Sequence, residues 1–183
     1  MTRIIAGQAR GRRLKVPTSM TRPTSDRVRE SLFASLETVI DLDGANVLDL
    51  YAGSGALGLE ARSRGAAQVI LVDRAPAVAR VIAENIAAVG LTGVRCERAD
   101  VRTFLRGTAT PQDVVFLDPP YDVPTQDVEE VLRMLGDGWL APAAVVVVER
   151  GEAGLRWPDG FTDEWDRSFG GTHVLRAVWY RPD

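Results

Sequence analysis

Residues 49–58 read Asp49-Leu50-Tyr51-Ala52-Gly53-Ser54-Gly55-Ala56-Leu57-Gly58 and end an apolar run that is expected to form a strand over 45–51. Their last six residues match G-x-G-x-x-G, a pattern that joins a strand to a helix where a nucleotide-containing cofactor approaches the backbone. Glycine suits such a turn because it adopts positive φ and leaves space above the main chain. The pattern alone does not distinguish one such cofactor from another.

Around this segment, apolar runs of strand length alternate with helical patterns. Strands are expected at 45–51, 68–73, 93–98, 113–118 and 143–149, and helices at 56–64, 76–89, 100–106 and 125–136. This alternation predicts a parallel, doubly wound α/β sheet. Residues 162–169 and 174–180 read as two further strands, so we expect a seven-stranded Rossmann-like sheet that ends in an antiparallel hairpin. The layout resembles the class I methyltransferase fold.

The N-terminal segment has a different character. Residues 3–6 and 13–16 are short β-type runs around an arginine-rich turn, which predicts a small hairpin. After a connector over 17–23, Ser25 or Asp26 can cap a helix. The apolar face of this helix is expected to comprise Val28, Leu32, Leu36, Val39 and Ile40. We therefore divide the chain into an arm, 1–23, and a main domain, 24–183.

Charge is concentrated in the same segment. Residues 1–29 hold one acid, Asp26, and eight basic side chains, although the whole chain has a net charge of −3. A basic arm on an acidic body is typical of a protein that binds a polyanion with one part of its surface. The candidate phosphate-binding residues are Arg3, Arg10, Arg12, Arg13, Lys15, Arg22, Arg27 and Arg29.

The bulk composition excludes several classes of protein. The chain has 183 residues, of which 45% are hydrophobic and 26% charged, as in an ordinary globular protein. It contains no apolar run long enough for a transmembrane helix and no apolar N-terminal core of a secretory signal. One cysteine and one histidine exclude an internal disulfide and leave little material for a metal site. We expect a cytoplasmic, monomeric protein without metal or membrane partners.

Acidic residues follow three successive predicted strands. Asp49 suits the ammonium of a methionine group and would repel a pyrophosphate, so it favours S-adenosylmethionine over NAD. Asp73 can accept hydrogen bonds from ribose hydroxyls, and Asp100 from an adenine amino group. Because ligands bind at the carboxyl ends of strands in open α/β sheets, we expect one cofactor site. Its candidate residues are Asp49, Tyr51, Ala52, Gly53, Ser54, Gly55, Asp73, Arg74, Ala99, Asp100 and Asp118.

The motif Asp118-Pro119-Pro120-Tyr121 follows the fourth expected strand. It is typical of enzymes that methylate amino groups conjugated to planar systems. Such an amine is a poor nucleophile, and the Asp118 carboxylate with the Pro119 carbonyl can hold its N–H groups and offset developing positive charge. The prolines stiffen the loop, and Tyr121 can stack on a base. Asp118, Pro119, Pro120 and Tyr121 are therefore the candidate catalytic residues.

The whole chain resembles the RsmD family of bacterial enzymes. The resemblance rests on Arg3 to Gly7, Gly11 to Leu14, Arg22 to Phe33, Asp49 to Ala61 and Asp118 to Tyr121, of which the block from Arg22 is the most specific. It implies methylation of guanine N2 in 16S rRNA within an assembling small ribosomal subunit, with S-adenosylmethionine as methyl donor. It also implies RNA contacts from the basic hairpin.

Other functions stay open on the residues alone. A DNA adenine-N6 or other amino-methyltransferase would share the Asp118 motif. A NAD-dependent oxidoreductase would share the glycine pattern, and a non-catalytic RNA-binding assembly factor would share the basic arm.

Overall fold

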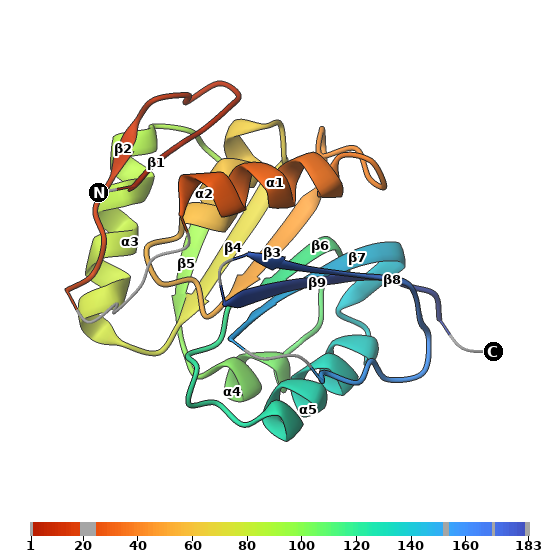
Figure 1. The fold of residues 1–183 in the computed structure, drawn as a ribbon. Helices are drawn as coiled ribbons and strands as arrows, with labels where there is room; N and C mark the ends of the chain where they lie inside the picture. The colour runs from red at the N-terminus through yellow and green to blue at the C-terminus, as the bar shows by residue number, and fades with distance from the viewer. Residues whose placement is uncertain (1, 19–24, 152–153, 170, 182–183) are drawn as a thin grey trace.

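A seven-stranded sheet forms the centre of the computed structural model, which describes residues 2–18, 25–151, 154–169 and 171–181 (Figure 1). The strand order is β5-β4-β3-β6-β7-β9-β8, and β9 runs antiparallel to both of its neighbours. The strands are β3 (Asn46–Leu50), β4 (Gln68–Asp73), β5 (Val94–Arg98), β6 (Gln112–Leu117), β7 (Leu140–Arg150), β8 (Phe161–Phe169) and β9 (Thr172–Trp179). The expected class I methyltransferase fold with its C-terminal antiparallel hairpin is confirmed.

Helices cover both faces of the sheet, as Figure 1 shows. One face carries α1 (Asp26–Leu36), α2 (Ala56–Ser63) and α3 (Pro76–Val89), and the other carries α4 (Val101–Leu105) and α5 (Thr125–Gly136). Side chains alternate along each strand, so that Val47 packs in the first layer and Leu48 in the second. None of the described helices combines the length and apolarity needed to cross a membrane.

Helix α1 is shorter than the sequence pattern predicted. The Ser25 hydroxyl accepts a hydrogen bond from Val28 N at 3.3 Å and caps its start. The helix ends at Leu36, and the Val39 side chain beyond it is 41% exposed. The prediction that Val39 extends the apolar face was therefore wrong, because the apolar spacing continues past the last helical turn.

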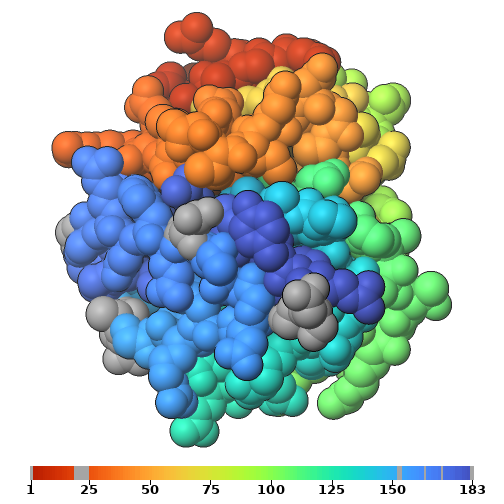
Figure 2. Space-filling view, turned by 90° about the vertical axis from the view of Figure 1, so that its right-hand side faces the viewer, coloured from red at the N-terminus to blue at the C-terminus, as the bar shows by residue number. Residues whose placement is uncertain are grey.

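The N-terminal hairpin is packed against the main domain. Its strands β1 (Thr2–Arg3) and β2 (Arg13–Leu14) pair antiparallel and are shorter than predicted. Ile4 and Leu14 are buried in the same apolar cluster as α1, α2 and α3. Figure 2 shows the red N-terminal segment at the top of one face, against the orange region that contains α1. Gly7 has a φ of +80°, and a Cβ there would lie 1.9 Å from the Ser63 carbonyl oxygen.

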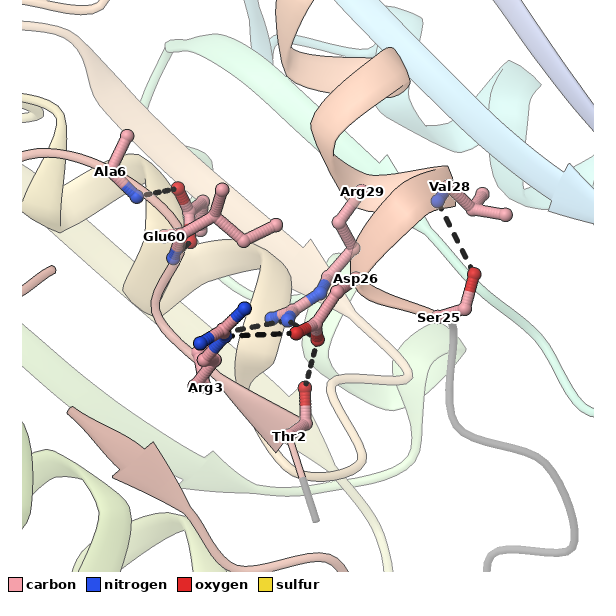
Figure 3. Close-up of polar contacts among 9 residues, drawn as sticks. Thr2, Arg3, Ala6, Ser25, Asp26, Val28, Arg29 and Glu60 are labelled. Atoms are coloured by element: carbon pink, nitrogen blue, oxygen red, sulfur yellow. Dashed lines mark hydrogen bonds and ion pairs between the residues drawn. The ribbon is translucent and has the colours of Figure 1, made fainter. Parts of the chain in front are cut away.

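A buried carboxylate holds the hairpin in place. Glu60, on α2, is fully buried and accepts hydrogen bonds from Ile5 N at 2.7 Å and from Ala6 N at 3.0 Å. Arg64 Nε donates to the same carboxylate at 2.8 Å. Figure 3 shows Glu60 facing the backbone near Ala6. The arm is therefore fixed to the domain by satisfied buried polar contacts as well as by apolar packing.

The Glu60 contacts predict a large loss of stability in Glu60→Ala. The substitution leaves two backbone N–H groups and the Arg64 guanidinium without their buried acceptor, so the free energy of unfolding should fall by about 3–5 kcal/mol. Urea denaturation would measure the change. Glu30→Ala, at an exposed site on α1, is the control and should stay within about 0.5 kcal/mol of wild type. Equal losses in the two variants would contradict the role of Glu60.

Candidate active site

A cavity of about 720 Å³ lies at the carboxyl ends of the parallel strands. Its wall includes residues after β3 and β6, which are neighbours in the sheet although the chain runs from β3 to β4 on the other side. Open α/β sheets bind ligands at such a switch point, and the volume is that of a small-molecule site. Every candidate cofactor residue except Gly55 lines this cavity, and so do all four candidate catalytic residues. The wall also includes Thr2, Arg29, Arg102, Asp127 and Glu149.

Asp49 is the most buried acid on the cavity wall, with 1% of its surface exposed. Its Oδ2 accepts a hydrogen bond from Gly58 N at 2.9 Å. Its Oδ1 is buried and has no hydrogen-bond partner among the described residues. Burial raises the pKa of Asp49 to about 8, although the Gly58 bond opposes the shift. A buried acceptor without a partner fits a cationic ligand group.

The glycine loop is shaped for close packing. Gly55 caps α2 with a φ of +77°, and Tyr51 also has positive φ, at +61°, a strained value for a tyrosine. A Cβ on Gly58 would lie 2.4 Å from the Leu71 side chain. Gly55 and Gly58 thus bring the backbone at the start of α2 close to Leu71 of the sheet, as the sequence pattern predicts.

The other two acids at strand ends are partly engaged by the backbone. Asp73 accepts hydrogen bonds from Gly53 N at 3.1 Å and from Ala75 N at 3.0 Å. Asp100 is the N-cap of α4 and accepts from Arg102 N at 3.0 Å. Both carboxylates line the cavity, so they hold the loops and can still face a ligand.

The Asp118 motif lies beside the glycine loop. Asp118 N donates to Leu50 O at 3.4 Å, which joins the ends of the neighbouring strands β6 and β3. Pro119 is buried, whereas Tyr121 is 53% exposed. A Cβ on Gly151 would lie 2.8 Å from the Tyr121 ring, so the chain after β7 closely approaches this ring. The motif thus extends from the buried part of the cavity to its surface.

The candidate phosphate-binding residues differ in exposure. Arg10, Arg13 and Arg27 are exposed and make no ion pair among the described residues. The remaining exposed candidates have partners: Arg3 binds Asp26, Lys15 binds Glu84 and Arg12 binds Ala88 O. Arg22 lies outside the described residues.

Arg29 is a correction to this set. Its side chain is fully buried, and its Nη2 donates to Arg3 O and to Asp26 Oδ1, both at 2.7 Å. It cannot meet a phosphate on the protein surface in this arrangement. It lines the cavity instead.

Sequence reasoning missed several cavity residues. Arg102 forms ion pairs with Asp127 at 3.0 Å and with Glu130 at 2.8 Å. Tyr51, which the sequence did predict, lines the same cavity, and its pKa is raised by burial and by the negative charge of Asp100. Glu149 is buried at the end of β7. Only its place at the end of an expected strand could have marked Glu149, and Arg102 and Asp127 carried no pattern that pointed to the cavity.

Comparisons with known proteins agree with this geometry. The family model described as "Conserved hypothetical protein 95" matches residues 2–178. Ribosomal RNA small subunit methyltransferase D of Escherichia coli K12 is 46% identical over 149 residues, which are 80% of this chain and 73% of that protein. The protein of that name from Haemophilus influenzae is 39% identical over 80% of this chain and 77% of its own length. The structure of yhhF from Escherichia coli superposes with a TM-score of 0.88 at 37% identity and covers 99% of each chain.

The fold, the glycine loop and the Asp-Pro-Pro-Tyr motif define a class I methyltransferase. The chain belongs to the conserved hypothetical protein 95 family, the RsmD family.

The unpartnered Asp49 carboxylate predicts a gain in stability for Asp49→Asn at alkaline pH. The folded pKa of about 8 lies above the ordinary aspartate value of 3.8 that applies in the unfolded chain, so the wild-type protein loses stability as pH rises between these values. Thermal melts without ligand should therefore differ least below about pH 4, and the advantage of the variant should grow as pH rises to about 8 and then stay constant. Asp159→Asn, at an exposed site, should follow wild type throughout. A pH-independent difference between Asp49→Asn and wild type would contradict the raised pKa.

Proposed function

We propose that the protein transfers a methyl group from S-adenosylmethionine to the exocyclic N2 amino group of a guanine in 16S rRNA. The products are N2-methylguanine, S-adenosylhomocysteine and a proton, which the amine loses after the transfer. The observation that carries the proposal is the match over residues 2–178, together with relatives named ribosomal RNA small subunit methyltransferase D. The chain keeps both the glycine loop and the Asp118 motif in one cavity, which supports an active enzyme over a non-catalytic assembly factor.

The residues present fit the proposed cofactor. Asp49 offers a buried acceptor without a partner to the methionine ammonium, and Asp73 faces the cavity where ribose hydroxyls need acceptors. Asp100, next to Ala99, would accept from the adenine amino group. S-adenosylmethionine supplies an activated, sulfonium-bound methyl group when it is bound. The pyrophosphate of NAD would be disfavoured beside Asp49, because its negative charge would repel the Asp49 carboxylate.

The Asp118 loop would position the amine. The carboxylate of Asp118 and the carbonyl of Pro119 accept the two N–H groups and aim the nitrogen lone pair at the methyl group. Pro120 limits loop motion, and Tyr121, at the exposed end, stacks on the base. The methyl group of the cofactor is already bonded to a good leaving group, the sulfonium sulfur. Positioning and charge stabilisation by these residues therefore make up much of the catalysis.

The N-terminal arm would hold the RNA. Arg10 and Arg13 are exposed on a hairpin that Glu60 and the apolar core fix in place. Arg27 adds a positive charge on α1, at the surface. In the proposed function the substrate is an assembling small subunit, and the enzyme acts as a cytoplasmic monomer without metal.

Asp118→Ala should reduce methyl transfer by about 10²–10³-fold, because it removes an acceptor that stabilises the charge developing on the amine. Labelled methyl transfer to small subunits that lack the modification, followed by nucleoside analysis, measures this. The variant should still bind S-adenosylhomocysteine, and Asp137→Ala, exposed after α5, should act as wild type. Unchanged turnover in Asp118→Ala would overturn the role of this carboxylate. Label in N6-methyladenine instead of N2-methylguanine would overturn the proposed substrate.

Replacing Arg10 and Arg13 by alanine should weaken RNA binding and flatten its salt dependence. Each lost phosphate contact should lower the slope of log K against log salt by roughly 0.7–0.9. Binding of a 16S rRNA fragment at several salt concentrations measures the slope. Arg133→Ala, exposed on α5, is the control for the loss of a surface positive charge outside the arm. An unchanged slope in the double variant would contradict phosphate contacts from the arm.

A further inference from the structure

Arg29 places a buried, half-satisfied guanidinium in the cavity wall. Its side chain is fully buried, and its Nη2 donates to Arg3 O and to Asp26 Oδ1. Its Nε and Nη1 are buried and have no hydrogen-bond partner among the described residues. Figure 3 shows the side chain extending from α1 toward Asp26 and Arg3.

A purely structural role does not account for these two nitrogen atoms. A buried charge is costly unless it is paired and its hydrogen-bonding groups are satisfied. Asp26 supplies one carboxylate, whose side chain is 43% exposed and which also binds Arg3 Nε at 3.2 Å. Arg29 is one of the residues that line the cavity, so the fold holds buried N–H donors beside it at an energetic cost, which is the pattern expected of a binding group.

The burial of Arg29 indicates which part of the cavity it serves. Tyr121, proposed to stack on the target base, is 53% exposed, whereas Arg29 and Asp49 are at most 1% exposed. The buried part of the cavity thus offers an acceptor without a partner, Asp49 Oδ1, and donors without partners on Arg29. An α-amino acid carries one ammonium and one carboxylate, which complement these two groups.

We propose that Arg29 binds the α-carboxylate of the methionine part of the cofactor, while Asp49 binds its ammonium. This inference rests on the proposed function and assigns one further binding residue to it. Asp26 is a positioning residue, because its Oδ1 holds Arg29 Nη2 while its Oδ2 binds Arg3 of the arm.

The test uses two ligands that differ only in the carboxylate. S-adenosylhomocysteine carries it, and S-adenosyl-3-thiopropylamine, the decarboxylated analogue, lacks it. Calorimetry would measure both affinities for wild type, Arg29→Met, Arg29→Lys and the surface control Arg133→Met. Circular dichroism and thermal melts would report whether each variant is folded.

Wild type should prefer S-adenosylhomocysteine by roughly 10–100-fold, the range for a charge-assisted hydrogen bond. Arg29→Met should lose most of that preference by weakening S-adenosylhomocysteine alone, Arg29→Lys should keep part of it, and Arg133→Met should keep all of it. Equal affinity of wild type for the two ligands would overturn the assignment without any variant.

Three other results would also contradict the assignment. If folded Arg29→Met loses affinity for both ligands by the same factor, Arg29 only shapes the cavity. If Arg29→Met keeps its affinity for S-adenosylhomocysteine but has a raised KM for RNA, Arg29 binds the target nucleotide instead of the cofactor. Wild type that binds neither ligand would overturn the proposed function itself, and the assignment with it.

Discussion

The hydrogen bond from Gly58 N to Asp49 Oδ2, 2.9 Å long and buried, is the contact on which the site depends. It ties the end of β3 to α2 and so sets the path of the loop between them. Gly58 makes this contact possible, because any larger residue would push α2 away from Leu71 and Val69. Asp49 Oδ1 has no partner among the described residues, and burial raises the pKa of the carboxyl to about 8 against the opposing effect of the Gly58 hydrogen bond. The cost of burying the charged carboxylate is removed by protonation or offset by a bound cation, which couples the local fold to ligand binding.

The N-terminal segment links the surface of the molecule to its interior. Glu60 and the apolar core fix the hairpin on α2, while Arg3 O and Asp26 hold the guanidinium of Arg29 at the cavity wall. The same short segment therefore presents exposed arginines to solvent and contributes to the buried site. RNA contacts on the arm and ligand contacts in the cavity would therefore involve residues that are joined by direct hydrogen bonds.

Much of this arrangement follows from local sequence signals. Helix α3 has the predicted bounds. Asp118 and Asp49 line one cavity, as the positions of β6 and β3 in the sequence predicted. Both features could be predicted because strand periodicity and glycine spacing are local properties of the sequence. Arg29 could not be placed in this way. Its sequence context is a basic segment that suggests exposure. Asp26, three residues earlier on α1, is a local partner, but Arg3 O meets Arg29 only in the folded chain. Glu60 likewise reads as an exposed helical residue until the hairpin packs over it. The end of α1 was misplaced because apolar spacing does not mark where helical hydrogen bonding stops.

The central claim is that the buried, unpartnered oxygen of Asp49 receives the ammonium of the cofactor. A crystal structure of the protein soaked with S-adenosylhomocysteine tests it most directly. The account predicts the amino nitrogen within about 3 Å of Asp49 Oδ1, with the Gly58 hydrogen bond retained. A ligand bound in the cavity with its amino nitrogen away from Asp49, and Oδ1 still without a partner, would contradict it.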